Sequence, residues 1–162
     1  MIEVVEEIQV NADSQKVWAF LSDVSQSLCF NRFHIEIITP SKFSVNGDSL
    51  FYIHHNFGFG NYEMSAKVTE CLPPKILAIS EINSENPDKG FPHDIRFEVF
   101  PNGNNVILHY SVSGTYGHRV QDMSFKPILK GVIKEELIKM KNAIESAEKL
   151  PHAAEPNTIT PT

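Results

Sequence analysis

Residues 118–150 read HRVQDMSFKPILKGVIKEELIKMKNAIESAEKL, and this stretch decides the fold of the chain. Its apolar residues recur every three or four positions, which is the spacing of one face of an α-helix. The members of this stripe are Phe125, Leu129, Val132, Ile133, Leu137, Met140, Ala143, Ile144, Ala147 and Leu150. The pattern therefore predicts one long helix, started or kinked near Pro127, whose apolar face must be buried against another layer.

That other layer is predicted from residues 34–114, where strand patterns alternate with turns. Six strands are expected, over residues 34–39, 49–57, 62–71, 75–82, 94–100 and 105–114. Pro73 and Pro74 break the third strand from the fourth, because proline cannot continue a sheet ladder. Asn102-Gly103 is the strongest short hairpin signal in the chain. A meander of this length has an apolar face of its own to bury.

The first 33 residues predict a strand followed by two short helices. Residues 2–10 alternate apolar and polar side chains, as a half-buried strand does. Asp13 or Ser14 can cap the helix NADSQKVWAFLSDV, and a second short helix is expected in SQSLCFNRF. The order strand, two helices, six strands and a long helix predicts an α+β fold. In this fold a strongly curved antiparallel sheet grips the C-terminal helix.

Length and composition limit the number of domains and the kinds of partner that are expected. One domain over residues 1–150 is expected, followed by a Pro/Thr-rich disordered tail over residues 151–162. The net charge of -6 and the lack of a basic cluster argue against nucleic-acid binding. No apolar run reaches membrane-spanning length, so stable membrane insertion is not expected.

The cysteine pattern and the N-terminal sequence indicate in which cellular compartment the protein is expected. Cys29 and Cys71 form neither a CxxC pair nor a zinc spacing, and we expect free thiols. The N-terminus is acidic and alternating, unlike a signal peptide, which predicts a cytoplasmic protein. The sequence contains no nucleophile elbow, HExxH, P-loop or dinucleotide fingerprint, so no cofactor and no metal are expected.

The order of these segments resembles the SRPBCC superfamily, which includes START domains, the birch-pollen-allergen family and bacterial polyketide cyclase/dehydrase-like proteins. The residues that carry the resemblance are IQVNADSQKVWAFLSDV (8–24), VTECLPPKILAI (68–79), NGNNVILHYSVSG (102–114) and the terminal helix. The resemblance covers about residues 1–150. It implies a helix-grip fold with a hydrophobic cavity between sheet and helix, which holds a lipid, polyketide, sterol or similar ligand. It does not imply one reaction.

Hairpin centres predict which side chains face that cavity, because successive strand residues point to opposite faces. A first hairpin centred on Gly58-Phe59 pairs Phe51 with Ala66, Ile53 with Met64, and His55 with Tyr62. A later hairpin centred on Asn102-Gly103 pairs Val99 with Val106, Phe97 with Leu108, Ile95 with Tyr110, and His93 with Val112. The Pro-Pro break places Val68 opposite Ile79. Apolar partners then coincide on one face in each hairpin.

The neighbouring histidines in FYIHHNFGFG (51–60) are separated by this register. His54 is expected on the outer surface, and His55 on the inner face beside Tyr62. His55 is either hydrogen-bonded at the cavity rim or a ligand contact and proton donor. Glu136 interrupts the apolar stripe of the long helix, and either forms an ion pair at a sheet edge or projects into a polar pocket. His109 is expected to face outward, and His34, His118 and His152 are expected at the surface.

Two sets of candidate residues follow. The cavity is predicted to be lined by Ile53, His55, Tyr62, Met64, His93, Ile95, Phe97, Leu108, Tyr110, Phe125, Leu129 and Glu136. The loops over 57–60, 83–92 and 114–118 should meet at one end of the sheet, and either gate the cavity or cap the core. Their aromatic entrance residues are Phe57, Phe59, Phe91 and Tyr116.

Three functions fit this pattern. The first is a monomeric or homodimeric binding protein for a hydrophobic small molecule. The second is a polyketide cyclase or dehydratase in which His55 and Glu136 are the candidate catalytic groups. The third is a protein-interaction module with a closed core and an exposed apolar patch. Whether any reaction is catalysed stays open at this point.

Overall fold

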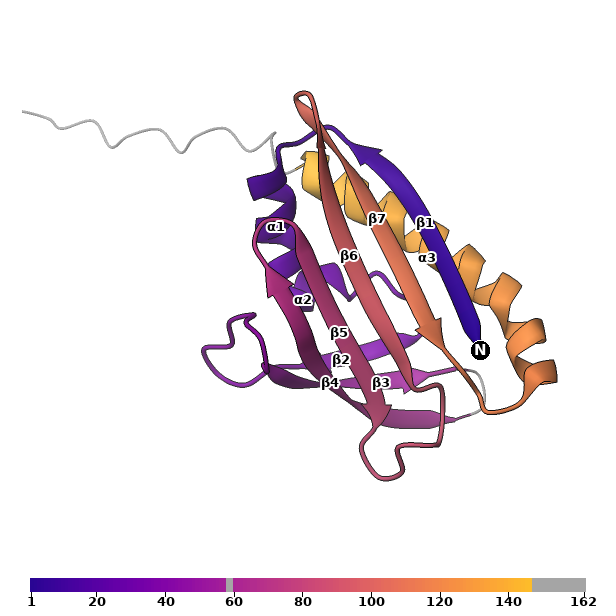
Figure 1. Cartoon of the computed structure of the whole chain (residues 1–162). Helices are drawn as coiled ribbons and strands as arrows, with labels where there is room; N and C mark the ends of the chain where they lie inside the picture. Colours follow the sequence, from indigo (N-terminus) through magenta and orange to yellow (C-terminus); the bar gives the residue numbers. More distant parts are fainter. Residues whose placement is uncertain (58–59, 147–162) are drawn as a thin grey trace, which may run out of the picture.

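The computed structural model describes residues 1–57 and 60–146 (Figure 1). In this part of the chain the element order is β1 (Ile2–Val10), α1 (Ser14–Ser22), α2 (Val24–Ser27), β2 (His34–Ile38), β3 (Leu50–Asn56), β4 (Asn61–Leu72), β5 (Ile76–Asn83), β6 (His93–Asn102), β7 (Asn105–Gly114) and α3 (Arg119–Ser146). The predicted order and the α+β class are confirmed. The expected tail over 151–162 lies outside the described residues.

The strands form one antiparallel sheet in the order β1-β7-β6-β5-β4-β3-β2. The sheet is strongly curled, so that β2 and β3 run across the direction of β5, β6 and β7 (Figure 1). The ladder between β4 and β5 has an irregularity between Val68 and Glu70. An irregularity of this kind bends a strand. The long strand β4 pairs with β3 through residues 61–67 and with β5 through residues 64–72.

The registers of two strand pairs agree with the predictions. Ile53 lies opposite Met64 and His55 opposite Tyr62 between β3 and β4. Val68 lies opposite Ile79 between β4 and β5. These three pairs place the expected side chains on the inner face of the sheet.

The predicted register of β6 and β7 is wrong by two residues. Phe97 lies opposite Tyr110 and not Leu108, and His93 lies opposite Gly114 and not Val112. The predicted partners of Ile95 and Val99 shift in the same way, to Val112 and Leu108. The two-residue loop is Gly103-Asn104, and Gly103 takes the left-handed φ of 64° that such a loop requires. A shift of two residues keeps every side chain on its face, so the inner and outer assignments hold.

Local signals explain the helices at the start of the chain. The side chain of Asp13 accepts a hydrogen bond of 2.8 Å from the amide of Lys16, which caps α1. Val17 and Leu21 then face the core one turn apart. The second helix, α2, is shorter than predicted, since it ends at Ser27 and an irregular segment leads to β2.

The long helix α3 crosses the concave side of the sheet (Figure 1). The large apolar residues of its predicted stripe from Phe125 to Ile144 are buried, and burial of each contributes about 1.5–3 kcal/mol. Ala143 is half-buried, and Ala147 and Leu150 lie outside the described residues. At its far end the carboxylate of Glu145 accepts a hydrogen bond of 2.7 Å from the amide of Asn11. No helix in the described ranges combines the length and the apolarity needed to cross a membrane.

Candidate functional site

A pocket of about 530 Å³ opens at the end of the molecule where α3 begins. We call it the mouth pocket. Parts of all three aromatic and glycine-rich loops reach it, through Phe57, through Asp88 and Gly90, and through Tyr116. The rest of its lining comes from the segment before β2, from β4 and from the first turns of α3. These residues are Phe33, Tyr62, Val120, Gln121, Ser124, Phe125 and Ile128.

Tyr116 offers the mouth pocket a polar group that the protein leaves unused. Its hydroxyl oxygen is buried and has no hydrogen-bond partner among the described residues. Burial raises the pKa of this phenol to about 12, and the neighbouring Tyr62 and Asp122 add to the effect. The phenol therefore keeps its proton near neutral pH and can donate a hydrogen bond to a ligand oxygen.

Five aromatic rings lie at and just beneath the floor of the mouth pocket, and we call them the aromatic layer. Ring centroids of neighbouring members lie 5.0–6.3 Å apart, as for Tyr116 with Phe125 at 5.0 Å and Phe57 with Phe91 at 6.3 Å. Aromatic pairs prefer such distances. The members are Phe33, Phe57, Phe91, Tyr116 and Phe125.

Beneath the aromatic layer lies an inner cavity of about 10 Å³. This volume has room for about one water molecule. Phe33 and Phe57 line both spaces, so the layer separates the mouth pocket from the inner cavity. The remaining lining is Asn31, His34, His55, Phe91, His93, Tyr110, Val112 and Leu129.

His34, His55 and His93 line this inner cavity, and Glu81 lies against two of them. We call these four residues the histidine–glutamate cluster. The Nε2 atom of His55 lies 2.8 Å from Oε2 of Glu81, and both side chains are almost completely buried. The Nε2 atom of His93 lies 3.5 Å from the same oxygen. The ring of His34 meets the ring of His55 edge-on, with centroids 4.5 Å apart.

Backbone carbonyls orient two of these rings. The Nδ1 atom of His34 lies 2.7 Å from the carbonyl oxygen of Leu28, and Nδ1 of His93 lies 2.6 Å from that of Phe91. A carbonyl oxygen only accepts, so Nδ1 carries the proton in both rings. In the neutral rings Nε2 then has a free lone pair.

Burial and mutual charge set the ionisation of the cluster. Burial lowers the pKa of His34 to about 4 and also lowers that of His93, although the charge of Glu81 opposes both shifts. Burial alone would raise the pKa of Glu81. The histidines around it, His93 and His55 foremost, outweigh burial and lower that pKa to about 2. Glu81 is thus an ionised carboxylate deep in the core.

Glu136 forms a separate polar group on the other side of the inner cavity. The hydroxyl of Tyr110 and the side-chain amide of Asn31 each donate a hydrogen bond of 3.1 Å to its Oε2 atom. Complete burial raises the pKa of Glu136 to about 8, although these two hydrogen bonds oppose the shift. No ion pair holds it among the described residues, and the edge ion pair considered from the sequence is not formed.

The predicted cavity residues fall into three places. Tyr62 and Phe125 line the mouth pocket, and His55, His93, Tyr110 and Leu129 line the inner cavity next to Glu136. The other five are packed in the core and line neither space: Ile53, Met64, Ile95, Phe97 and Leu108. Of the predicted entrance residues, Phe57 and Tyr116 line the mouth pocket and Phe91 lies beneath it. Phe59 lies outside the described residues.

Three residues of the inner group were missed from the sequence. Glu81 follows Leu77 and Ile79 at a spacing of two, so its inward direction was readable from strand alternation. Asn31 and His34 lie in or beside the irregular segment between α2 and β2, where no periodicity marks a face. The prediction of His34 at the surface is wrong, because the ring is held inward by the carbonyl of Leu28.

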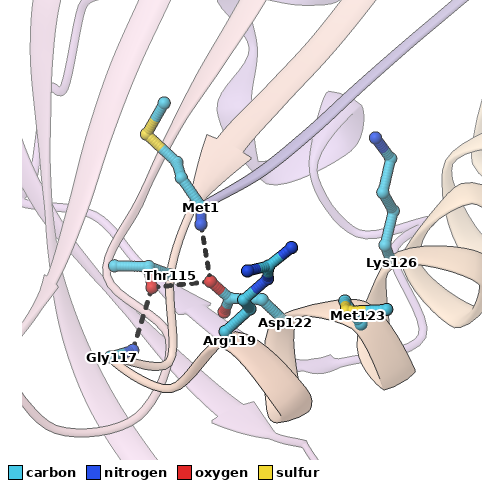
Figure 2. A pocket seen from close by; sticks show the side chains of 7 residues that line it. All are labelled: Met1, Thr115, Gly117, Arg119, Asp122, Met123 and Lys126. Carbon is cyan, nitrogen blue, oxygen red and sulfur yellow. Dashed lines mark hydrogen bonds and ion pairs between the residues drawn. The ribbon is translucent and has the colours of Figure 1, made fainter.

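A second pocket, of about 500 Å³, lies beside the start of α3 (Figure 2). At its centre the Asp122 carboxylate accepts hydrogen bonds from Thr115 and from the amide of Tyr116, and pairs with the Met1 amino group at 2.7 Å. These contacts, that from the amino group first, lower the pKa of Asp122 to about 2. The carboxylate is therefore already satisfied by groups of the protein. Its contacts join β1, α3 and the loop that precedes α3.

No protein-family model matches the chain, and no curated protein is significantly similar to it in sequence. Solved structures do match over most of its length. A conserved protein from Geobacillus kaustophilus superposes with a TM-score of 0.71 at 16% identity, covering 90% of this chain and 97% of that one. This similarity concerns the fold.

Two matching structures come from biosynthetic loci. The di-domain aromatase/cyclase StfQ of the steffimycin pathway has a TM-score of 0.69 at 12% identity, covering 92% of this chain and 52% of StfQ. DynU16, from the dynemicin biosynthetic locus, has a TM-score of 0.63 at 14% identity, covering 91% of this chain and 48% of DynU16. The chain thus has the helix-grip fold that the sequence resemblance implied.

Proposed function

We propose that the protein binds a hydrophobic small molecule, of a lipid-, polyketide- or aromatic-like class, in the mouth pocket. The observation that carries the proposal is the pocket itself. Its volume of about 530 Å³ lies within the range of small-molecule sites, and its lining is mainly apolar and aromatic. The helix-grip fold, which StfQ and DynU16 share, agrees with a small-molecule ligand.

The polar groups of the pocket suggest how the ligand lies. The unpaired hydroxyl of Tyr116 is buried on the floor side, so it suits a carbonyl or hydroxyl oxygen at the inner end of the ligand. Asp88 and Gln121 also line the pocket and offer further polar contacts. An apolar ligand with one inner oxygen would satisfy the only lining hydroxyl that is buried without a partner among the described residues.

Native mass spectrometry of the purified protein tests this function. The protein is expected to carry a retained apolar molecule, or to take up one equivalent of an anthraquinone probe at micromolar concentration. The retained molecule is released by organic extraction and identified by its mass. A protein that retains no small molecule and binds neither an anthraquinone nor a long-chain fatty acid would overturn the proposal.

A cyclase or dehydratase is the second candidate, favoured by the buried acid–base groups near the pocket. A general acid or base must come within hydrogen-bond reach of the substrate. His55 and Glu136 do not line the mouth pocket, because the aromatic layer lies between. The binding function needs no such contact. Turnover of a linear polyketide mimic that is lost in both His55→Gln and Glu136→Gln would favour the enzyme.

An interaction module is the third candidate. Val120, Met123 and Ile128 form exposed apolar positions near the start of α3, with 77%, 67% and 48% of their surface accessible. Val120 and Ile128 also line the mouth pocket. This contiguity favours a ligand-capturing rim over a separate protein-docking patch.

A further inference from the structure

We propose that His34, His55 and Glu81 form a binding site for one divalent first-row transition-metal cation, with Zn²⁺ as the reference ion. This site is distinct from the mouth pocket and lies beneath the aromatic layer. None of the three residues lines the mouth pocket. The inference therefore stands or falls apart from the proposed small-molecule function.

The first argument is the distance between possible ligand atoms. One ligand atom from each of His34, His55 and Glu81 lies within 4.8 Å of the others. Ligands at 2.0–2.1 Å in a tetrahedral zinc site lie about 3.4 Å from one another. The Nε2 atom of His55 and Oε2 of Glu81 are already 2.8 Å apart. Binding therefore needs only side-chain adjustments of about 1 Å, mainly of His34.

The second argument is the set of unpaired atoms. Nε2 of His34, Nδ1 of His55 and Oε1 of Glu81 are all buried without a hydrogen-bond partner among the described residues. Buried polar atoms normally have a partner, and each exception needs a reason. Here three exceptions belong to the same three side chains. A cation would engage the unused lone pairs of His34 Nε2 and Glu81 Oε1, and it would take the place of the proton that His55 Nε2 now shares with Glu81 Oε2.

The third argument is the orientation of the rings. His34 donates its Nδ1 proton to the carbonyl oxygen of Leu28 at 2.7 Å. Metal-binding histidines are commonly held in this way, with the second nitrogen hydrogen-bonded and the first left free. His93 has the same arrangement with the Phe91 carbonyl, and its Nε2 atom faces Glu81 Oε2 at 3.5 Å.

The nature of the ligands selects the class of metal. Two imidazoles and one carboxylate suit Zn²⁺, Fe²⁺ or Co²⁺, whereas Mg²⁺ and Ca²⁺ prefer all-oxygen sites. His34 and His55 also line the inner cavity of about 10 Å³. That volume has room for one water molecule as a further ligand.

Metal titration of tag-free protein, first stripped with a chelator, tests the proposal. Calorimetry with Zn²⁺ and visible absorption with Co²⁺ are expected to show one equivalent bound per chain, with a rise in Tm. His34→Gln and Glu81→Gln should each weaken binding by at least about 100-fold and abolish the Tm rise. The matched control is His54→Gln. His54 is the exposed neighbour of His55 and pairs with Glu36 and Glu63, so its loss should leave metal binding unchanged.

Two results would overturn the site. One is the absence of stoichiometric metal uptake by the wild-type protein, which would mean that the histidine–glutamate cluster binds protons and no metal ion. The other is uptake that persists in both His34→Gln and Glu81→Gln, which would mean surface binding. Because Glu81→Gln changes a buried hydrogen bond to His55, circular dichroism of each variant accompanies the titration, and His34→Gln serves if Glu81→Gln does not fold. Binding of the anthraquinone probe is measured on the same variants and should be unchanged.

Discussion

The mouth pocket and the histidine–glutamate cluster lie on two sides of one aromatic layer, and they differ in size, polarity and exposure. The mouth pocket is wide, apolar and open, and its lining comes largely from loops and from the first turns of α3. The cluster is buried and polar, its three histidines line a cavity of about 10 Å³, and strands β3, β5 and β6 supply most of it. The comparison indicates that the mouth pocket can change its occupant without cost to the fold, whereas the cluster cannot lose a member without cost.

The largest expected effect is loss of stability when Glu81 is removed. Glu81→Ala removes the buried acceptor of His55 and leaves a space in the core, and should lower the free energy of unfolding by about 3 kcal/mol. The matched control is Glu63→Ala, because Glu63 of β4 pairs with His54, the neighbour of His55 in β3, on the exposed face of the sheet. This exposed pair should contribute about 0–1 kcal/mol. Urea unfolding of metal-free protein measures both, and equal losses would erase the distinction between the two faces.

The next effect is a pH dependence that comes from Glu136. Its pKa is about 8 in the folded protein against 4.5 in the unfolded chain, so the folded state holds a proton that the unfolded state has lost between these values. Stability should therefore fall as pH rises from about 5 to about 8, by up to about 1.4 kcal/mol per pH unit from this group. The difference between wild type and Glu136→Gln isolates this contribution. Parallel pH profiles for the two proteins would contradict the raised pKa.

A smaller loss of stability is expected from a substitution at Gly114. This residue lies opposite His93, the cluster residue that follows the loop containing Phe91. A methyl group there would lie 2.5 Å from the carbonyl oxygen of Pro92, which is too close for any real contact. Gly114→Ala should cost about 1–3 kcal/mol through overpacking. Gly47→Ala is the control, since nothing lies within 4 Å of the added atom. If Gly114→Ala left the free energy of unfolding unchanged, the contact between the aromatic layer and the histidine–glutamate cluster would not be tightly packed.

The smallest effect concerns affinity and not stability. Tyr116→Phe removes a buried hydroxyl that has no partner among the described residues, so thermal stability should stay the same or rise slightly. Affinity for an anthraquinone probe should fall about tenfold if the hydroxyl donates to the ligand. Tyr52→Phe, on the outer face of β3, is the control for the loss of a phenol. Unchanged affinity in Tyr116→Phe would remove this residue from the site.

Much of the fold could be predicted because the periodic pattern of apolar residues shows the inner face of a helix or strand even where a turn is placed wrongly. The α3 stripe and the alternation in β3 and β4 placed Glu136, His55 and His54 on their faces without any knowledge of the loops. The β6–β7 register was wrong, since Asn102-Gly103 was taken as the turn while the loop is Gly103-Asn104. The faces were still correct, because the error was an even number of residues.

The internal volume could not be predicted in the same way. A stripe shows which side chains point inward, but not whether they meet. Phe97 and Leu108 fill the space in which a large cavity was expected, and the accessible volume lies instead above the aromatic layer. Asn31 and His34 were missed for a related reason. Asn31 contacts Glu136 on a distant helix and His34 contacts the carbonyl of Leu28, and contacts of an irregular segment leave no periodic trace in the sequence.

The central claim is that the mouth pocket is the ligand site, and a matched pair of tryptophan variants on α3 tests it most directly. Ser124→Trp places an indole in the mouth pocket, whereas Ile138→Trp adds the same group at a position that is 53% exposed and far along the helix. Binding of an anthraquinone probe, followed by calorimetry, should fall at least about tenfold in Ser124→Trp and stay unchanged in Ile138→Trp. Full affinity in Ser124→Trp, with the fold intact by circular dichroism, would contradict the account.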